Sequence, residues 1–408
     1  MRADGSEEEA RHVMKRTLLP AGGMLLAVLV AVVVIGEAGL RLAGFSAPIW
    51  YRPDPLLGWA LRAGTEGRFT KEGGAYVEIN AAGFRDQPHP LAKPRAVYRI
   101  AVLGDSVVEA FQVDTKAAFW WQLQEKLRAC PALQGREVEA IAFGVSGYGT
   151  AQQALLLESS AIGYRPDLVL LAFAPNDIVD NSPRLAPEKE RPFFRIDGDG
   201  LRLDTSFTGT SEFTRRSSAL FAGYRAASDW MRVVQLAQAA RHGVETWQQA
   251  GVAHAKVAGP AGAPPGLEPT TITALFTAPR DANWESAWTI TERLLVRMAR
   301  FAARNEARFA VAALSHSAQV HPDPTTRKNL QDALGAPDLF YIERRLEGLG
   351  RREGIQMIAL APELQRRAEA GHIYFHGFKN YRMGWGHWNE EGHRAAAEII
   401  ARSLCRSL

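Results

Sequence analysis

A serine follows an apolar run at a position from which it could act as a nucleophile. Residues 100–103 are apolar, and Gly104-Asp105-Ser106 comes directly after them. If the run is a strand, the hydroxyl of Ser106 lies at its carboxyl end. There a base can deprotonate it, and backbone N–H groups can stabilise an oxyanion. Asp and Ser are also common in turns and helix caps, so the tripeptide alone leaves both interpretations open.

Three further segments contain groups that could assist such a serine. A glycine-rich turn over residues 143–152 could offer the backbone N–H of Gly147, and Asn176 could offer its side-chain amide. Near the C-terminus, His387 could reach back as a general base. Each segment also has a structural interpretation, because glycine and Asn-Asp pairs are frequent in turns and a lone histidine is often structural.

The pattern between these segments indicates the elements that would position them. Short apolar runs bounded by turn residues predict buried parallel strands, and longer periodic stretches predict helices between them. This alternation predicts an α/β fold, doubly wound, with a mainly parallel five-stranded sheet and its functional residues at the carboxyl ends of the strands. The predicted strands are 98–103, 138–143, 168–173, 309–314 and 355–360, and the predicted helices are 115–129, 151–162, 286–306, 328–352 and 390–405.

The alternation is interrupted once, which predicts an insertion over residues 178–284 in a single domain. Its first part, residues 192–207, carries the turn sequence Asp-Gly-Asp-Gly between apolar residues, which is typical of a hairpin. A helical stretch is predicted at about 216–250, and an Ala-, Gly- and Pro-rich surface loop at 258–269.

The N-terminal part predicts a membrane anchor. Residues 17–36 carry no charged side chain, and as a helix they would span roughly 30 Å, the thickness of a bilayer core. Lys15 and Arg16 precede the run, so residues 1–16 are expected in the cytoplasm and the rest of the chain outside it. This predicts a single-pass protein of the cytoplasmic membrane. A cleaved signal peptide and a buried helix are the alternatives.

Composition narrows the function classes further. The chain has 408 residues, 48 Lys and Arg against 44 Asp and Glu, and a formal net charge of +4, which gives no basis for nucleic-acid binding. Its hydrophobic content of 47% excludes a disordered chain. The two cysteines, Cys130 and Cys405, cannot form a cysteine zinc framework; they either pair in an oxidising compartment or remain buried thiols.

Together the four segments resemble the SGNH (GDSL-like) hydrolase superfamily, over about residues 95–405. The resemblance implies a flavodoxin-like SGNH hydrolase domain over 95–408, preceded by an extended lead-in over 46–94. It implies Ser106 as nucleophile, His387 as general base, and the Ser106 and Gly147 N–H groups with the Asn176 amide as oxyanion hole. The anchor, the lead-in sequence 80–86 and the stretch 288–292 resemble a membrane-anchored bacterial branch.

One position departs from that family's pattern. The family usually carries an aspartate two or three residues before the base histidine, where this chain has Trp385 and Gly384, and no aspartate follows Asp338. A backbone carbonyl, Glu390 or a side chain from elsewhere is then expected to orient His387.

Other polar residues near the motifs have less defined roles. Asp105 and Asp177 are possible supporting residues, and the sequence does not decide the role of Glu109. His393 is the nearest rival base, with packing or capping as the expected role, and Ser146 is a less favoured nucleophile.

The resemblance implies a serine-dependent ester hydrolase, an acyl or acetyl esterase, that needs no metal and no organic cofactor. Its expected partners are a small acyl ester or an acylated saccharide, and the membrane through residues 17–36; the oligomeric state is left open. One alternative is an O-acyltransferase or deacetylase acting on envelope polysaccharide. The other is a non-catalytic binding protein, because the usual aspartate is missing. Aromatic residues that could stack on sugar rings are Trp385, Trp388, Tyr148 and Tyr381.

Overall fold

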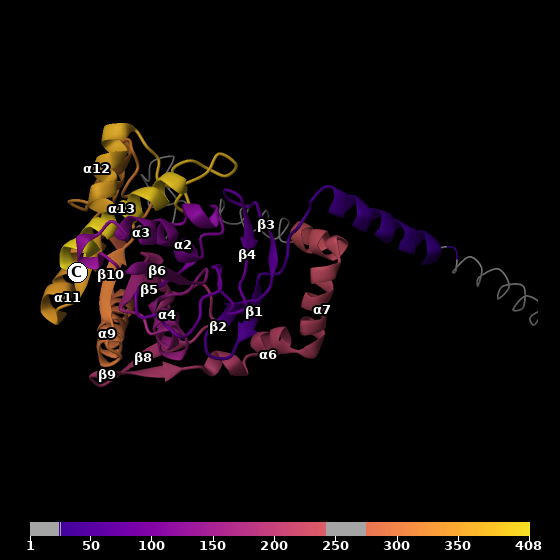
Figure 1. Ribbon diagram of the computed structural model, residues 1–408, viewed down its shortest axis with the longest axis horizontal. Helices are drawn as coiled ribbons and strands as arrows, with labels where there is room; N and C mark the ends of the chain where they lie inside the picture. Colours follow the sequence, from indigo (N-terminus) through magenta and orange to yellow (C-terminus); the bar gives the residue numbers. More distant parts are fainter. Residues whose placement is uncertain (1–23, 25, 242–274) are drawn as a thin grey trace, which may run out of the picture. The chain divides into compact units, whose positions relative to one another are not determined.

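The computed structural model describes residues 24, 26–241 and 275–408, shown in Figure 1. The described chain divides into two compact units. The larger unit holds residues 50–222 and 275–408, and the smaller one holds the described residues up to 49 together with those from 223 to 241. The predicted cytoplasmic tail and the predicted loop at 258–269 lie outside the described residues.

A five-stranded parallel sheet forms the centre of the larger unit, and all five predicted strands are confirmed. Its order is β11-β10-β7-β5-β6. In chain order this is 2-1-3-4-5, the flavodoxin-like arrangement, whose ligand crevice lies at the carboxyl end of the first strand, where the winding reverses. The strands are β5 (Val97–Gly104), β6 (Glu137–Gly144), β7 (Leu168–Phe173), β10 (Arg308–Ala313) and β11 (Gln356–Ala359).

Helices cover both faces of the sheet because successive strand residues point to opposite sides. In β5, Leu103 packs into one hydrophobic cluster and Val102 into the other. Figure 1 shows α4 and α9 on one side of β5 and β6, and α3 and α13 on the other. The first cluster includes α4 (Thr150–Ser159), α9 (Ala282–Arg304) and α11 (Tyr341–Glu353), and the second includes α3 (Phe119–Leu127), α12 (Ala361–Gly371) and α13 (Glu390–Ser407).

The single helix predicted at 328–352 is wrong. The structure has α10 (Pro324–Leu334) and then α11, separated by a short connection. Gly335 ends α10 in the left-handed conformation, with φ +63°, and Pro337 follows two residues later. Glycine at this position and proline just beyond it are a recognised helix stop. The helix α12 was not predicted.

The lead-in before the sheet forms two small hairpins. The antiparallel pairs are β1 (Tyr51–Asp54) with β2 (Gly58–Leu61), and β3 (Glu66–Phe69) with β4 (Ala75–Glu78). After them, the buried guanidinium of Arg85 donates to the carbonyls of Glu109 and Ala110, at the end of the short helix α2 (Ser106–Glu109). The lead-in is therefore packed against the element that begins with Ser106.

The inserted region begins with the predicted hairpin, which is confirmed as β8 (Phe193–Asp197) and β9 (Gly200–Asp204). The predicted helical stretch after it is divided into α6 (Ser211–Ser217), α7 (Ala219–Trp230) and a helical segment at 232–241. Residues 242–250 of the predicted stretch lie outside the described residues. The remaining short elements of the larger unit are α5 (Asn176–Asp180), η1 (Thr115–Ala117), η2 (Pro131–Leu133), η3 (Ala161–Tyr164) and η4 (Ser206–Gly209).

The two cysteines form a disulfide. Cys130 follows α3 and Cys405 lies in α13, and the two Cα atoms are 5.7 Å apart. The bond links helices that pack on the same face of the sheet. Of the two possibilities that the sequence leaves open, the structure has the paired one.

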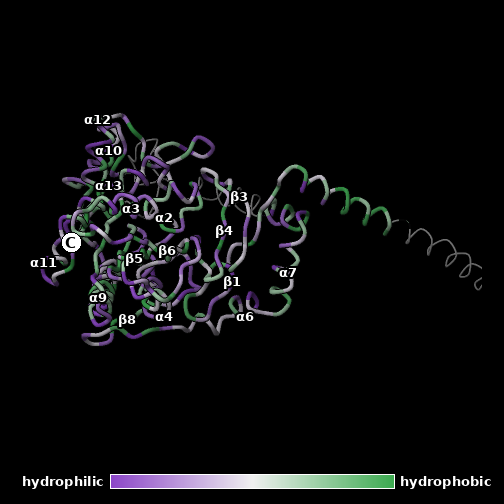
Figure 2. Tube along the Cα trace, viewed as in Figure 1, coloured by the Kyte–Doolittle hydropathy of each residue, from purple (hydrophilic) through white to green (hydrophobic). Residues whose placement is uncertain are grey.

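The smaller unit consists of a helical segment at 26–42 and the helical residues from 223 to 241. Figure 2 shows residues 26–35 at the hydrophobic end of the scale. Glu37 accepts from the N–H of Val233 at 3.0 Å, and Gln235 accepts from the N–H of Ala47 at 2.8 Å. Among the residues described, no helix combines the length and the apolar content needed to cross a bilayer. Residues 17–23 and 25 of the predicted anchor are outside them.

Candidate active site

Ser106 and His387 lie within hydrogen-bonding distance. Ser106 is the first residue of α2, and Asp105 caps this helix by accepting from the N–H of Val107 at 3.0 Å. The hydroxyl of Ser106 donates to Nε2 of His387 at 2.8 Å. The two residues are separated by 281 positions in the chain, and the turn after β5 meets the loop before α13. This is the arrangement that a serine nucleophile and a general base require.

The far side of the imidazole is held by Glu72, a residue that the sequence analysis missed. Nδ1–H of His387 donates to Oε2 of Glu72 at 2.5 Å, and the backbone N–H of His387 donates to Oε1 at 2.7 Å. Glu72 is only 8% exposed and lies in the loop between β3 and β4. A carboxylate at Nδ1 fixes the tautomer in which Nε2 accepts the serine proton.

The loop that carries Glu72 is clamped by the loop that carries His387. Asn380 accepts from the N–H of Gly73 at 3.0 Å and donates to its carbonyl at 2.6 Å. At Gly386, φ is +73°, and a Cβ atom there would lie 2.2 Å from Oε1 of Glu72. Only glycine allows the carboxylate to come this close to the backbone beside His387.

The environment of His387 raises its pKa above the ordinary value of 6.5. Burial lowers this pKa, but the hydrogen bond and the negative charge of Glu72 raise it by more, with further contributions from Asp105 and Glu109. The imidazole is therefore surrounded by groups that stabilise its protonated form. This is the property required of a base that must hold a proton during a reaction.

The residues proposed for an oxyanion hole follow the neighbouring strands. Gly147 lies in the turn after β6, and Asn176 begins α5 after β7. Nδ2 of Asn176 donates to Asp180 at 3.1 Å and lies 3.4 Å from Oδ2 of Asp105, the residue before Ser106. Ser106, Gly147, Asn176 and His387 are all partly exposed.

Two of the possible supporting residues lie beneath this surface. Asp105 caps α2 and is buried, which raises its pKa. Asp177 is fully buried and accepts from the Thr150 hydroxyl at 3.3 Å and the Gln153 amide at 3.4 Å. Burial raises the pKa of Asp177 well above its ordinary value, and the negative charge of Asp105 adds to this. Both residues support the local structure around the site.

Of the three alternatives that the sequence leaves open for orienting His387, the structure has a side chain from elsewhere, not Glu390. Glu390 is exposed in the first turn of α13, whereas Glu72 occupies the position beside Nδ1. The sequence offers no local signal for this partner, because the contact joins residues 315 positions apart. The only hint is an acidic residue ahead of the Gly73-Gly74 turn.

The other candidates have structural positions. His393 is buried and accepts from the N–H of Phe119 at 3.2 Å, and burial lowers its pKa to about 3. The idea that Trp388 and Tyr148 stack on sugar rings is wrong, since both are buried in the core. Tyr381 is 55% exposed and Trp385 is partly exposed.

Glu109 has a defined position that the sequence could not give. Its buried carboxylate accepts from the Tyr51 hydroxyl at 2.6 Å and from the backbone N–H of Ser146. Burial raises the pKa of Glu109 to about 7. Glu109 therefore connects α2, the lead-in and the turn that contains Gly147.

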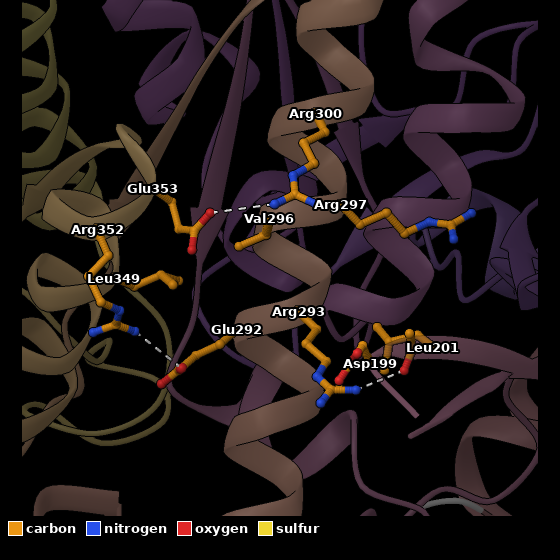
Figure 3. Close-up of a pocket in the computed structure, with 11 residues that line it drawn as sticks. Asp199, Leu201, Glu292, Arg293, Val296, Arg297, Arg300, Leu349, Arg352 and Glu353 are labelled. Carbon is orange, nitrogen blue, oxygen red and sulfur yellow. Dashed lines mark hydrogen bonds and ion pairs between the residues drawn. The ribbon is translucent and has the colours of Figure 1, made fainter. Parts of the chain in front are cut away.

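A cavity of about 370 Å³ lies elsewhere, between α9, α11 and β9 (Figure 3). Arg300 faces Glu353 at 3.8 Å, and Arg352 faces Glu292 at 3.6 Å, so charged side chains of both signs line it. None of the predicted site residues lines this cavity. Within the described ranges, no group of three or more His, Cys, Asp or Glu side chains is arranged as metal ligands.

No protein-family model matches the sequence, and no curated protein does. Among solved structures, an acetyl xylan esterase, AlAXEase, has a TM-score of 0.36 and 9% identity, covering 75% of this chain and 99% of that one. A GDSL-like lipase from Bacteroides thetaiotaomicron has a TM-score of 0.32 and 11% identity, and the match covers 76% of this chain and 89% of that one. The lipase/acylhydrolase from Enterococcus faecalis has a TM-score of 0.33 and 12% identity, and the match covers 76% of this chain and 96% of that one. Because these TM-scores are low, only the geometry of the site supports a function.

Proposed function

We propose that this protein is a serine-dependent ester hydrolase of the SGNH type that acts through an acyl-enzyme. The observation that carries the proposal is the continuous chain from the Ser106 hydroxyl through His387 to Glu72, with heavy-atom distances of 2.8 and 2.5 Å. Ser106 lies at the carboxyl end of β5, where the winding of the parallel sheet reverses. Nucleophile, base and orienting carboxylate are the three parts that activate a serine.

In the acylation step, Nε2 of His387 takes the proton of Ser106 while Oγ attacks the acyl carbonyl carbon. The electron pair of the C=O π bond moves to oxygen, and the backbone N–H groups of Ser106 and Gly147 and the amide of Asn176 hold this oxyanion. When the carbonyl re-forms, the bond to the alcohol oxygen breaks and the alcohol leaves with the proton from His387. Each oxyanion donor typically contributes about 3 kcal/mol.

In the deacylation step, a water molecule takes the place of the alcohol. His387 accepts a proton from this water, whose oxygen attacks the acyl carbon and forms a second oxyanion at the same position. Collapse breaks the bond to Oγ, and His387 returns the proton to Ser106. The product is a carboxylic acid, and Glu72 balances the charge of the imidazolium in both steps.

The test is hydrolysis of p-nitrophenyl acetate by the Ser106→Ala variant. We expect a loss of at least about 10³-fold in kcat, since the nucleophile is absent. Ser159→Ala is the matched control, because Ser159 is exposed at the end of α4. Labelling of the unaltered chain by a fluorophosphonate, and none of Ser106→Ala, would identify the nucleophile. An unchanged rate in Ser106→Ala would exclude the proposal, and absence of both labelling and turnover would favour a binding protein.

A second candidate function keeps the acyl-enzyme and changes the acceptor to a saccharide hydroxyl. It is favoured by aromatic side chains at the surface near the base: Tyr381 is exposed, and Trp385, two residues before His387, is partly exposed. The guanidinium of Arg382 lies 3.5 Å from the centre of the Trp385 ring. The apolar faces of aromatic side chains can stack on sugar rings. Acetyl transfer to an oligosaccharide, measured against acetate release, separates the two functions.

We also propose that residues 17–36 anchor the chain in the cytoplasmic membrane, with the catalytic unit outside the cytoplasm. The charge-free run after Lys15 and Arg16 supports this location, as does the disulfide, which is typical of oxidising compartments. The test is extraction of membranes with alkaline carbonate. The full chain is expected to stay with the membranes and a chain lacking residues 1–45 to be released. Release of both would contradict the anchor.

A further inference from the structure

We infer that Trp59 is a positioning residue that aims the N–H of Gly147 at the oxyanion. The inference rests on the proposed function and adds a residue to it. Trp59 belongs to β2 of the lead-in and is 87 positions away from the turn it contacts. Neither the serine motif nor the histidine motif includes it.

The contact is made to the peptide group that contains the proposed oxyanion donor. Nε1–H of Trp59 donates to the carbonyl of Ser146 at 3.0 Å. That carbonyl and the N–H of Gly147 belong to one planar trans peptide unit, in which C=O and N–H point in opposite directions. Fixing the carbonyl of Ser146 toward the indole therefore fixes the direction of the Gly147 N–H.

The preceding peptide group is held as well. The N–H of Ser146 donates to the buried carboxylate of Glu109, on the helix that begins with Ser106. The two peptide groups on either side of the Cα atom of Ser146 are thus each held by a hydrogen bond. One bond is to Glu109 in α2 and the other is to Trp59 in β2. The turn can present its next N–H in one direction only.

Trp59 is itself held firmly. The hydroxyl of Tyr148 donates to the carbonyl of Trp59, and the two rings pack edge to face with centres 5.7 Å apart. The guanidinium of Arg191 lies 5.0 Å from the centre of the indole. Gly147 has φ +78°, and a Cβ atom there would approach Cζ2 of Trp59 to 3.3 Å. The indole is therefore in close contact with the turn it orients.

With this assignment, the lead-in contributes residues that position both the base and an oxyanion donor of the proposed catalytic centre. Its second hairpin supplies Glu72, which orients His387, and its first hairpin supplies Trp59, which orients Gly147. Base and oxyanion donor are both set by a segment that lies outside the α/β sheet.

The experiment replaces the indole while keeping an aromatic ring. In Trp59→Phe we expect kcat for p-nitrophenyl acetate to fall about 10- to 100-fold, less than the 10²- to 10³-fold loss of a whole oxyanion donor, with KM within about threefold. Affinity for phenylboronic acid is expected to fall in parallel, since its tetrahedral adduct with a serine places an oxygen in the oxyanion hole. Trp50→Phe is the matched control in the same lead-in.

A second substitution separates the N–H from the ring shape. Site-specific replacement of Trp59 by 3-benzothienylalanine keeps the bicyclic ring and removes only the donor, and the same losses in kcat and boronate affinity are expected. The inference is overturned if this variant, or a folded Trp59→Phe, matches Trp50→Phe in kcat and boronate affinity. Full activity of Ser106→Ala would instead overturn the proposed function, so the two failures are distinguishable.

Discussion

Glu72 and His387 are joined by two hydrogen bonds, one to the imidazole and one to the backbone N–H, across 315 positions of the chain. A carboxylate directly before the histidine in sequence would be held by the same loop as its partner. Here the carboxylate comes from a separate hairpin, so the site is complete only when the lead-in is packed against the loop before α13. If the chain has the proposed function, its activity therefore depends on the folding of the lead-in.

The first prediction concerns Glu72 itself. Glu72→Gln removes the charge that stabilises the imidazolium and allows the wrong tautomer of His387. We expect kcat for p-nitrophenyl acetate to fall by about 10²- to 10⁴-fold, the upper figure being the loss in a protease that lacks its orienting aspartate. Glu72→Asp keeps the charge and is expected to retain more activity than Glu72→Gln.

Glu78→Gln is the control for that substitution. Glu78 is an exposed carboxylate at the end of β4, in the same hairpin. Its replacement is expected to leave kcat within about twofold, since an exposed side chain away from special features contributes little. If Glu72→Gln behaves like Glu78→Gln, then Glu72 does not take part in activating His387.

The second prediction is the pH dependence of kcat/KM. His387 must be neutral to accept the serine proton, and its pKa is raised above the ordinary 6.5: burial lowers it, and Glu72 raises it by more. Activity is expected to increase as pH rises, with an apparent pKa above 6.5 on the acidic limb. In Glu72→Gln this limb should shift to lower pH. A limb that stays in place in the variant would show that Glu72 does not set the pKa.

The sequence was sufficient for the sheet because the signals are local. Each strand is a short apolar run bounded by turn residues, and burial on both faces requires this composition. The same reasoning failed at 328–352, where the helical periodicity resumes after Gly335 and Pro337 and hides the break. The positions of the motif serine and histidine were predictable from local signals too, since Ser106 comes just after a strand and His387 just before a helix.

Glu72 and Trp59 could not be predicted because their function depends on tertiary packing alone. Both lie in short hairpins whose turn residues specify a local bend but not which surface the hairpin covers. Their partners, His387 and Ser146, are 315 and 87 positions away. A carboxylate or an indole in a turn-rich segment has many ordinary roles, and only the packed structure distinguishes between them.

The third prediction concerns the disulfide. Cys130 and Cys405 are separated by 275 positions, and removing a bond that closes so long a loop is expected to lower the free energy of unfolding by about 5–6 kcal/mol in the chain-entropy account. The variant Cys130→Ala/Cys405→Ala should therefore melt at a lower temperature. Treating this variant with a reductant should not change its melting temperature further, whereas the unaltered chain should be destabilised. Equal melting temperatures without reductant would contradict the prediction.

The last prediction uses Glu109, whose pKa burial raises to about 7 from the ordinary 4.5. Between about pH 4.5 and pH 7 the folded chain therefore keeps a proton on Glu109 that the unfolded chain has lost. As pH rises through this range, the contribution of Glu109 to the free energy of unfolding falls. Glu109→Gln keeps a neutral side chain at every pH. The variant is expected to gain stability over the unaltered chain when the pH is raised from 5 to 8. The gain in the free energy of unfolding is at most about 3 kcal/mol, and it is seen as a higher relative melting temperature at pH 8. Calorimetry at the two pH values, with Glu78→Gln as control, measures the difference; a difference of opposite sign would mean that the ionised carboxylate stabilises the fold through Tyr51 and Ser146.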